Sequence, residues 1–214
     1  TKGKPAPVIF RRTFIKAASA AALSTVIPGA LPAKASPVPS TRPIPSSGKQ
    51  IPCVGLGSWI TFNVGDDPVL LDDCTNVIKA FVAGGGRMID SSPMYGSSQE
   101  TIGYGLDKLS VAGAVFCADK VWTSDTDGGP AQIEVSRQAW RIPRFDLLQV
   151  HNLMAWQAHL ETLFEMKAEG ELKYAGITTS HGRRHDELEQ IMAEQPIDFV
   201  QLTYNPVDRE AENK

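Results

Sequence analysis

The sequence has little cysteine, and its cysteines are not spaced for metal binding or disulfide bonding. It contains three, Cys53, Cys74 and Cys117, and their odd number and wide separation argue against a disulfide framework. No close spacing of cysteine and histidine indicates a zinc site. Cys53 and Cys117 lie in strand-like runs, so we expect free thiols buried in the core.

Positive charge is also not in excess. The 214 residues include 21 Lys and Arg against 24 Asp and Glu, a formal net charge of −3, which gives no reason to expect a nucleic-acid partner. Hydrophobic residues make up 42% of the chain, enough to bury a core. Beyond residue 35, 15 basic residues remain against 24 acidic ones, about −9 by the formal count.

Two glycine-rich motifs that cradle phosphates are missing. Gly55 and Gly57 begin a G-x-G pattern, but Ile60 stands where G-x-G-x-x-G requires its third glycine. No Walker-type phosphate loop is found either. A Rossmann dinucleotide fold is therefore excluded at its first turn.

Strand-like and helix-like segments alternate strictly through the rest of the chain, which predicts a parallel α/β sheet covered by helices. Because the Rossmann solution is excluded, we expect a (β/α)8 TIM barrel, of which this chain supplies about six of the eight strands. The predicted strands are residues 53–60, 87–92, 114–122, 145–152, 173–180 and 198–205, and the predicted helices are residues 68–83, 98–109, 130–142, 156–171 and 185–195.

The first 35 residues have the composition of a targeting segment. They carry six basic residues and no acidic one, and Arg11-Arg12 precedes a mildly apolar run and a small-x-small site at residues 33–35. We predict a twin-arginine-type signal peptide over residues 1–35, with export to the periplasm or beyond through the twin-arginine machinery. An ordinary secretory signal and a membrane anchor are the alternatives, but Pro28 and the many alanines leave the run too short and too weak for a stable span.

The remaining residues divide into a short linker and one domain. Residues 36–50 are rich in Pro and Ser, which predicts an exposed linker or leading turn. Residues 51–214 show no break in composition, so we assign them to a single barrel domain that is incomplete at its carboxyl end. An open six-stranded sheet would leave two edges unpaired, and we expect such a chain by itself to fold poorly and to have little activity.

Four side chains that can transfer or hold protons lie at the predicted strand ends: Asp90, Tyr95, Lys120 and His151. The carboxyl ends of parallel strands form one functional face, so we expect them to meet. Lys120 lies in an apolar run and needs a partner, which Asp90 can supply. Its ammonium would lower the pKa of the Tyr95 phenol, and His151 could orient a carbonyl oxygen. A hydride donor is also needed, which implies a nicotinamide cofactor.

Each of these residues also has a purely structural explanation. Asp90 could cap a loop or helix, and Tyr95 could be a turn aromatic. Lys120 could extend along the sheet to the surface, and His151 could be a hydrogen-bonded core residue. Only their combination on neighbouring strand ends favours a site.

The motifs around these residues resemble the aldo-keto reductase family. MIDSSPMYGSSQETIGYGL (88–106) is similar to the family signature, ADKVW to its lysine strand, and LLQVHN to its histidine strand. The resemblance spans about residues 52–206. It implies an NAD(P)H-dependent reduction of an aldehyde or ketone to an alcohol on a barrel without a Rossmann motif. Asp90, Tyr95, Lys120 and His151 would be the catalytic tetrad, with Tyr95 as the general acid.

The same resemblance implies further site residues and a cofactor. Thr178, Thr179 and Gln201 would contact the nicotinamide amide, although many members have Ser-Asn where Thr178-Thr179 stands. Trp59 and Trp122 would line the pocket of a small carbonyl substrate, or simply pack in the barrel. NADP(H) is favoured over NAD(H), and no metal is expected.

Two other functions remain open. A subunit that binds or senses the cofactor, with slow or no turnover, could use the same fold. An inactive fragment is the third possibility, because several of the expected loops and strands are missing from the sequence.

Overall fold

The computed structural model describes residues 39–213, so the predicted signal peptide at residues 1–35 lies outside the described residues. The strands are β1 (Thr41–Pro43), β2 (Gln50–Pro52), β3 (Leu56–Gly57), β4 (Met88–Asp90), β5 (Phe116–Val121), β6 (Leu147–Val150), β7 (Tyr174–Thr178) and β8 (Phe199–Gln201). The helices are α2 (Pro68–Ala83), α3 (Ser98–Leu109), α4 (Gly129–Ala139), α5 (Trp156–Glu169) and α6 (His185–Glu194), with short 3-10 turns at Ala112–Ala114, His151–Leu153 and Glu210–Asn213.

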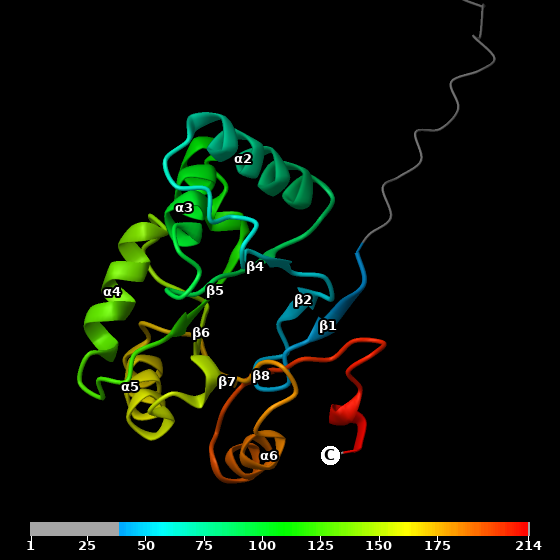
Figure 1. Cartoon of the computed structure of the whole chain (residues 1–214), viewed down its shortest axis with the longest axis vertical. Coiled ribbons are helices and arrows are strands. Elements are labelled where there is room, and N and C mark those ends of the chain that lie inside the picture. The colour runs from blue at the N-terminus through cyan, green and yellow to red at the C-terminus, as the bar shows by residue number, and fades with distance from the viewer. Residues whose placement is uncertain (1–38, 214) are drawn as a thin grey trace, which may run out of the picture. The chain divides into compact units, whose positions relative to one another are not determined.

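Six of these strands form one parallel sheet in the order β3-β4-β5-β6-β7-β8, so each strand pairs with its neighbour in sequence. The sheet curls, and the helices lie on its outer side (Figure 1). The fold is therefore an α/β half-barrel, which confirms the prediction of a partial (β/α)8 barrel. Within residues 39–213, β3 and β8 are the two edges of this sheet.

Alternation along β5 explains how one strand serves two environments. Every residue of β5 is buried, but successive side chains point to opposite faces of a strand. Phe116 and Ala118 belong to the cluster inside the curl, whereas Cys117 and Val121 pack under the helices. Lys120 therefore lies on the inner face, and Asp119 faces the helices.

The inner face of the sheet has an apolar layer at the amino-terminal ends of the strands. This layer is closed by the antiparallel hairpin of β1 and β2, which contributes the buried Ile44 and the partly buried Ile51. The hairpin occupies part of the segment predicted as a linker, and sequence patterning did not reveal it. The apolar layer consists of Met88, Phe116, Leu147, Tyr174 and Phe199.

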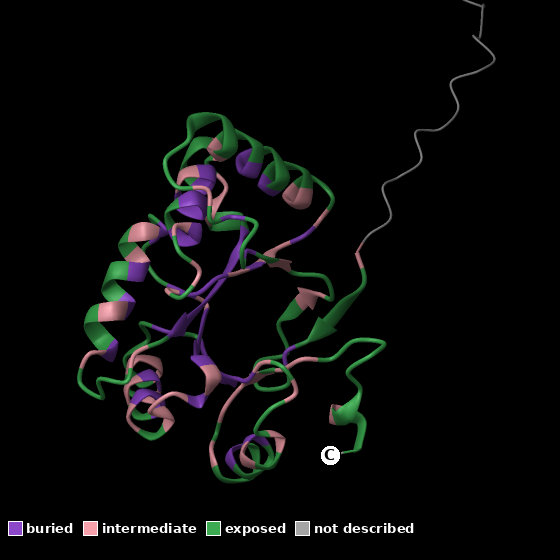
Figure 2. Cartoon of the chain, viewed as in Figure 1, coloured by how far each residue is buried: buried purple, intermediate pink, exposed green. Residues whose placement is uncertain are grey.

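Local sequence signals set the helix ends. The side chain of Asp67 accepts hydrogen bonds from the backbone N–H groups of Val69 and Leu70 and so caps α2, which has Pro68 in its first turn. Helix α5 ends at Gly170, whose φ of 79° places it in the left-handed region that glycine tolerates. The outer faces of the helices are exposed and their inner faces buried (Figure 2).

The cysteine prediction is half correct. Cys117 is a buried free thiol in β5, and burial raises its pKa to about 12. Cys53 is also free but exposed, so its predicted burial was wrong. The reason is that the first predicted strand is shorter than expected: β3 begins only at Leu56, and Cys53 lies in the chain leading to it.

Residues 39–213 contain neither a membrane-spanning helix nor a cluster of metal-binding side chains. No helix in this part of the chain is long and apolar enough to cross a membrane. No group of three or more His, Cys, Asp or Glu side chains in the same residues is arranged to hold a metal ion.

Candidate active site

A buried lysine forms the centre of the site. The Lys120 side chain is only 2% exposed, and its Nζ donates to Asp90 Oδ2 at 2.6 Å and to the Ser91 carbonyl oxygen at 2.8 Å. Asp90 comes from the neighbouring strand β4, where Asp90 and Ala118 are paired in register. The predicted pairing of Lys120 with Asp90 is confirmed, and it offsets the cost of burying an isolated ammonium.

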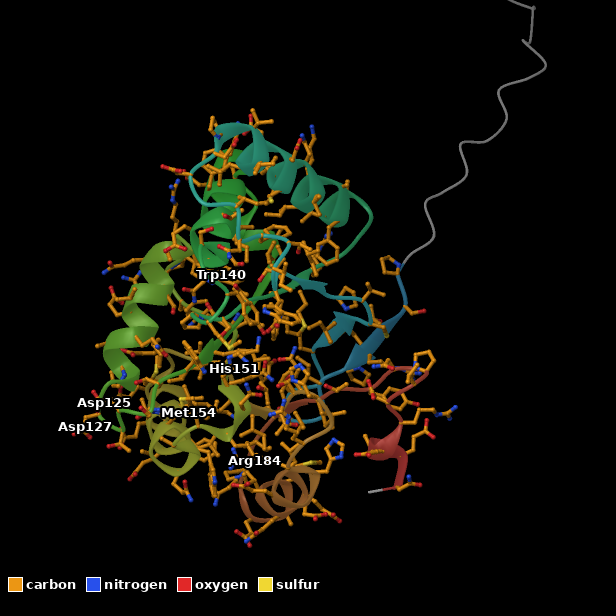
Figure 3. The ribbon with its side chains drawn as sticks, viewed as in Figure 1. Asp125, Asp127, Trp140, His151, Met154 and Arg184 are labelled. Carbon is orange, nitrogen blue, oxygen red and sulfur yellow. The ribbon has the colours of Figure 1, made fainter. Side chains whose placement is uncertain are left out.

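Tyr95 and His151 lie beside this ion pair. Lys120 Nζ is 5.2 Å from the centroid of the Tyr95 ring, and the rings of Tyr95 and His151 meet edge to face with centroids 5.8 Å apart. Tyr95 comes from the loop before α3, and His151 follows β6 directly. The structure thus brings all four predicted residues together, with His151 near the middle of the curled sheet (Figure 3).

Burial dominates the protonation equilibria of this site. It raises the pKa of Tyr95, and the opposing effect of Lys120 is smaller. The ammonium lowers this pKa, as predicted, but the larger opposing effect of burial was not predicted. Burial, followed by repulsion from Lys120, lowers the pKa of His151 to about 4, so its imidazole is neutral at pH 7.

A second buried carboxylate lies behind the lysine, and sequence reasoning missed it. Asp119 is fully buried on the helix-facing side of β5. Its Oδ1 accepts the Lys120 backbone N–H at 2.8 Å, and its Oδ2 accepts from Gln99 Nε2 at 2.7 Å and from Trp140 Nε1 at 2.6 Å. These bonds tie β5 to α3 and to the end of α4, so they position the strand that carries Lys120. The available signal was a second charged residue in an apolar strand.

The pKa of Asp119 reflects two opposing effects. Burial raises it to about 7, while the neighbouring ammonium of Lys120 and the N–H donors lower it. Trp140 is fully buried at the end of α4, and its indole N–H is one of the donors to this carboxylate (Figure 3).

The three predicted cofactor residues gather at the carboxyl ends of β7 and β8. Thr178 Oγ1 accepts the Asn152 backbone N–H at 3.1 Å, and Gln201 Nε2 reaches across the curl to Asp90 Oδ2 at 3.2 Å. Thr179 Oγ1 is buried and has no hydrogen-bond partner among the described residues. An unpartnered buried hydroxyl at this position suits an amide ligand, so these residues fit a nicotinamide.

The backbone after His151 is held in an unusual conformation. Asn152, Leu153 and Ala155 all have positive φ angles of 46–53°, which non-glycine residues rarely adopt. Arg184 Nη1 donates to the Asn152 carbonyl at 2.7 Å from the loop before α6 (Figure 3). This contact and the Thr178 hydroxyl stabilise the strained segment beside the imidazole.

The two predicted pocket tryptophans lie at the same end of the sheet. Trp59 follows β3 and is 54% exposed, and Trp122 follows β5 and is 37% exposed. Neither is packed in the core, so the alternative explanation of barrel packing is not supported. Both remain available to a ligand at the strand ends.

Fold and site together define a parallel strand–helix half-barrel with a Lys-Asp-Tyr-His cluster at the carboxyl ends of its strands. Residues 53–214 match the aldo/keto reductase family. The chain therefore belongs to the aldo/keto reductase family, as its motifs predicted. No curated protein sequence matches it.

Solved structures share this fold at low sequence identity. An aldo/keto reductase from Brucella melitensis superposes with a TM-score of 0.66 at 22% identity, covering 82% of this chain and 67% of that one. A glycerol dehydrogenase from Gluconobacter oxydans gives 0.68 at 22% identity, covering 81% and 58%. A Bombyx mori aldo-keto reductase in complex with NADP gives 0.62 at 17% identity, covering 82% and 61%. The chain thus spans about three fifths to two thirds of the length of these proteins.

Proposed function

We propose that this protein reduces an aldehyde or ketone to an alcohol, with Tyr95 as the proton donor and NADP(H) as the preferred cofactor. The observation that carries the proposal is the position of Lys120 Nζ. It is clamped by Asp90 and the Ser91 carbonyl, and it lies 5.2 Å from the Tyr95 ring centroid. An ammonium fixed beside a phenol stabilises the phenolate that remains after proton donation.

Each residue of the site has its own role in the reduction of the carbonyl group. The Tyr95 hydroxyl donates its proton to the carbonyl oxygen, and Lys120 offsets the charge left on the phenolate. His151, neutral at pH 7, donates a hydrogen bond to the same oxygen and orients it. Thr179 and Gln201 would bind the nicotinamide amide. A nicotinamide held there would supply the hydride for the carbonyl carbon.

The first test is reduced-nicotinamide oxidation on adding a small aldehyde, in wild type and in Tyr95→Phe. Loss of the proton donor should lower kcat by about 10²- to 10⁴-fold while cofactor binding, followed by fluorescence quenching, is retained. Tyr104→Phe is the matched control, because the hydroxyl of this half-buried tyrosine on α3 forms its hydrogen bonds with Asp72 and Lys108, not with the site residues. Equal rates for Tyr95→Phe and wild type would contradict the assigned role.

One observation favours a second candidate, a cofactor-binding subunit with slow or no turnover. Burial raises the pKa of Tyr95 above its ordinary value, which makes the phenol a weaker acid. The same experiment separates the two functions. In the subunit, the cofactor binds, aldehyde causes no oxidation, and Tyr95→Phe changes neither result.

A further inference from the structure

The His151 imidazole is held on its Nδ1 side by a serine that has no part in the function above. Ser92 Oγ lies 2.8 Å from His151 Nδ1, and both side chains are buried. The backbone N–H of Met94 donates to the same Oγ at 3.2 Å. Ser92 belongs to the loop after β4, so this contact joins the ends of two strands that flank β5.

The hydrogen between Ser92 and His151 belongs to the serine, because only this arrangement satisfies both groups. A hydroxyl has one hydrogen and two lone pairs, and Met94 occupies one lone pair of Ser92. Within residues 39–213, Ser92 Oγ has no other acceptor than His151 Nδ1. If Nδ1 carried a proton, it would donate to Ser92, and the serine hydrogen would be buried without an acceptor. Donation from Ser92 to Nδ1 satisfies both groups.

We propose that Ser92 is a positioning residue that holds His151 in the tautomer protonated at Nε2, so that Nε2–H donates to the carbonyl oxygen of the substrate. This inference rests on the proposed function. No hydrogen bond joins Nε2 to another residue in the described part of the chain, so its hydrogen is free for a ligand. Because the lowered pKa leaves one proton on the neutral ring, the nitrogen that carries it decides whether the imidazole can donate.

The tautomer can be observed without any turnover. Protein labelled with 15N-histidine is examined at pH 7.5 by long-range 1H–15N spectroscopy, which distinguishes a protonated ring nitrogen from a bare one. The His151 signals are assigned by their loss in His151→Gln. We expect Nε2–H in wild type and a mixture of tautomers in Ser92→Ala, while Ser92→Thr retains the hydroxyl and the wild-type tautomer.

The matched control is Ser136→Ala. Ser136 is equally buried, but it accepts from Gln99 on the outer side of the sheet, so its removal should leave the His151 signals unchanged. In the aldehyde assay, Ser92→Ala should lower kcat/KM by about tenfold, the size of one hydrogen bond, with Ser92→Thr restoring most of it.

The outcomes separate this inference from the function on which it rests. A wild-type His151 protonated at Nδ1 overturns the inference, even if no Ser92 variant folds. An unchanged tautomer in Ser92→Ala overturns it as well. A third outcome is that His151 carries Nε2–H in wild type but not in Ser92→Ala, and that the wild-type protein reduces no carbonyl. In that case the proposed function fails, whereas the role of Ser92 in fixing the tautomer is supported.

Discussion

Replacing Gly103 with alanine should loosen the support of the active site from outside the sheet. Gly103 lies in the middle of α3, and a Cβ built on it would be 2.0 Å from the carbonyl oxygen of Ala139, the last residue of α4. Trp140 C lies 3.0 Å from the same Cβ position. Both obstacles are backbone atoms, which cannot rotate away, so α3 and the end of α4 must move apart.

The change in unfolding free energy caused by Gly103→Ala is the sum of two opposing contributions. Alanine in a helix interior is favoured over glycine by about 1 kcal/mol. Overpacking costs about 1–3 kcal/mol, and the upper end applies here because the clash is with backbone. Displacement would also stretch the bonds from Gln99 on α3 and Trp140 on α4 to Asp119. We expect a net destabilisation of about 2 kcal/mol or more, a fall in Tm of about 4–8 °C.

Two other glycines supply graded controls. In Gly105→Ala, on the same helix, the nearest atom to the new Cβ is Ile78 Cδ1 at 2.7 Å, the far end of a side chain that can shift. In Gly113→Ala nothing lies within 4 Å. Urea unfolding should rank Gly103→Ala as the least stable, with Gly105→Ala and Gly113→Ala near wild type. If Gly103→Ala unfolds at the same urea midpoint as Gly105→Ala, the close α3–α4 contact, and the support it gives Asp119, must be rejected.

Two further predictions concern pH and export. Burial raises the pKa of Asp119 in the folded protein to about 7. The folded protein therefore keeps a proton that the unfolded chain releases near pH 4. As a result, Asp119 contributes stability that is lost as pH rises from about 4 to about 7. Asp119→Asn should remove this contribution. The unfolding free energy of the variant minus that of wild type should then rise with pH between pH 4 and 7. If the two stability curves run parallel over this range, the raised pKa of Asp119 is contradicted. His151 contributes in the opposite direction in both proteins, since its pKa is lowered to about 4. If residues 1–35 are a twin-arginine signal, changing Arg11 and Arg12 together to lysine should stop export of a fused reporter, as seen by cell fractionation; unchanged export would favour an ordinary secretory signal.

Much of the fold could be predicted because hydrophobic periodicity and end signals agree along this chain. Helix α3 occupies residues 98–109, as predicted, and all six sheet strands lie within their predicted ranges. The strands are shorter than predicted, most of all β3. A strand lasts only while its neighbour offers hydrogen bonds, and Ile60, with a φ of 65°, has already left the extended conformation.

The candidate site could be predicted in part. Asp90, Tyr95, Lys120 and His151 were identified because strand ends in a parallel barrel share one face, and a buried lysine requires a partner. Tyr95 showed the limit of this reasoning. The lowering of its pKa by the ammonium was predicted from the sequence, but only the structure showed that Tyr95 is buried deeply enough for burial to outweigh the ammonium.

The sequence by itself determined the strand–helix alternation, the parallel sheet and the residues at the strand ends, because these depend on local periodicity and connection rules. Only the tertiary structure decided that Asp119 accepts from Gln99 and Trp140, and that Ser92 holds His151. Those hydrogen bonds join residues from different elements, so they depend on how the helices and loops pack against the sheet. Hydrogen bonds form only within about 3 Å, and sequence spacing does not resolve side-chain positions that closely.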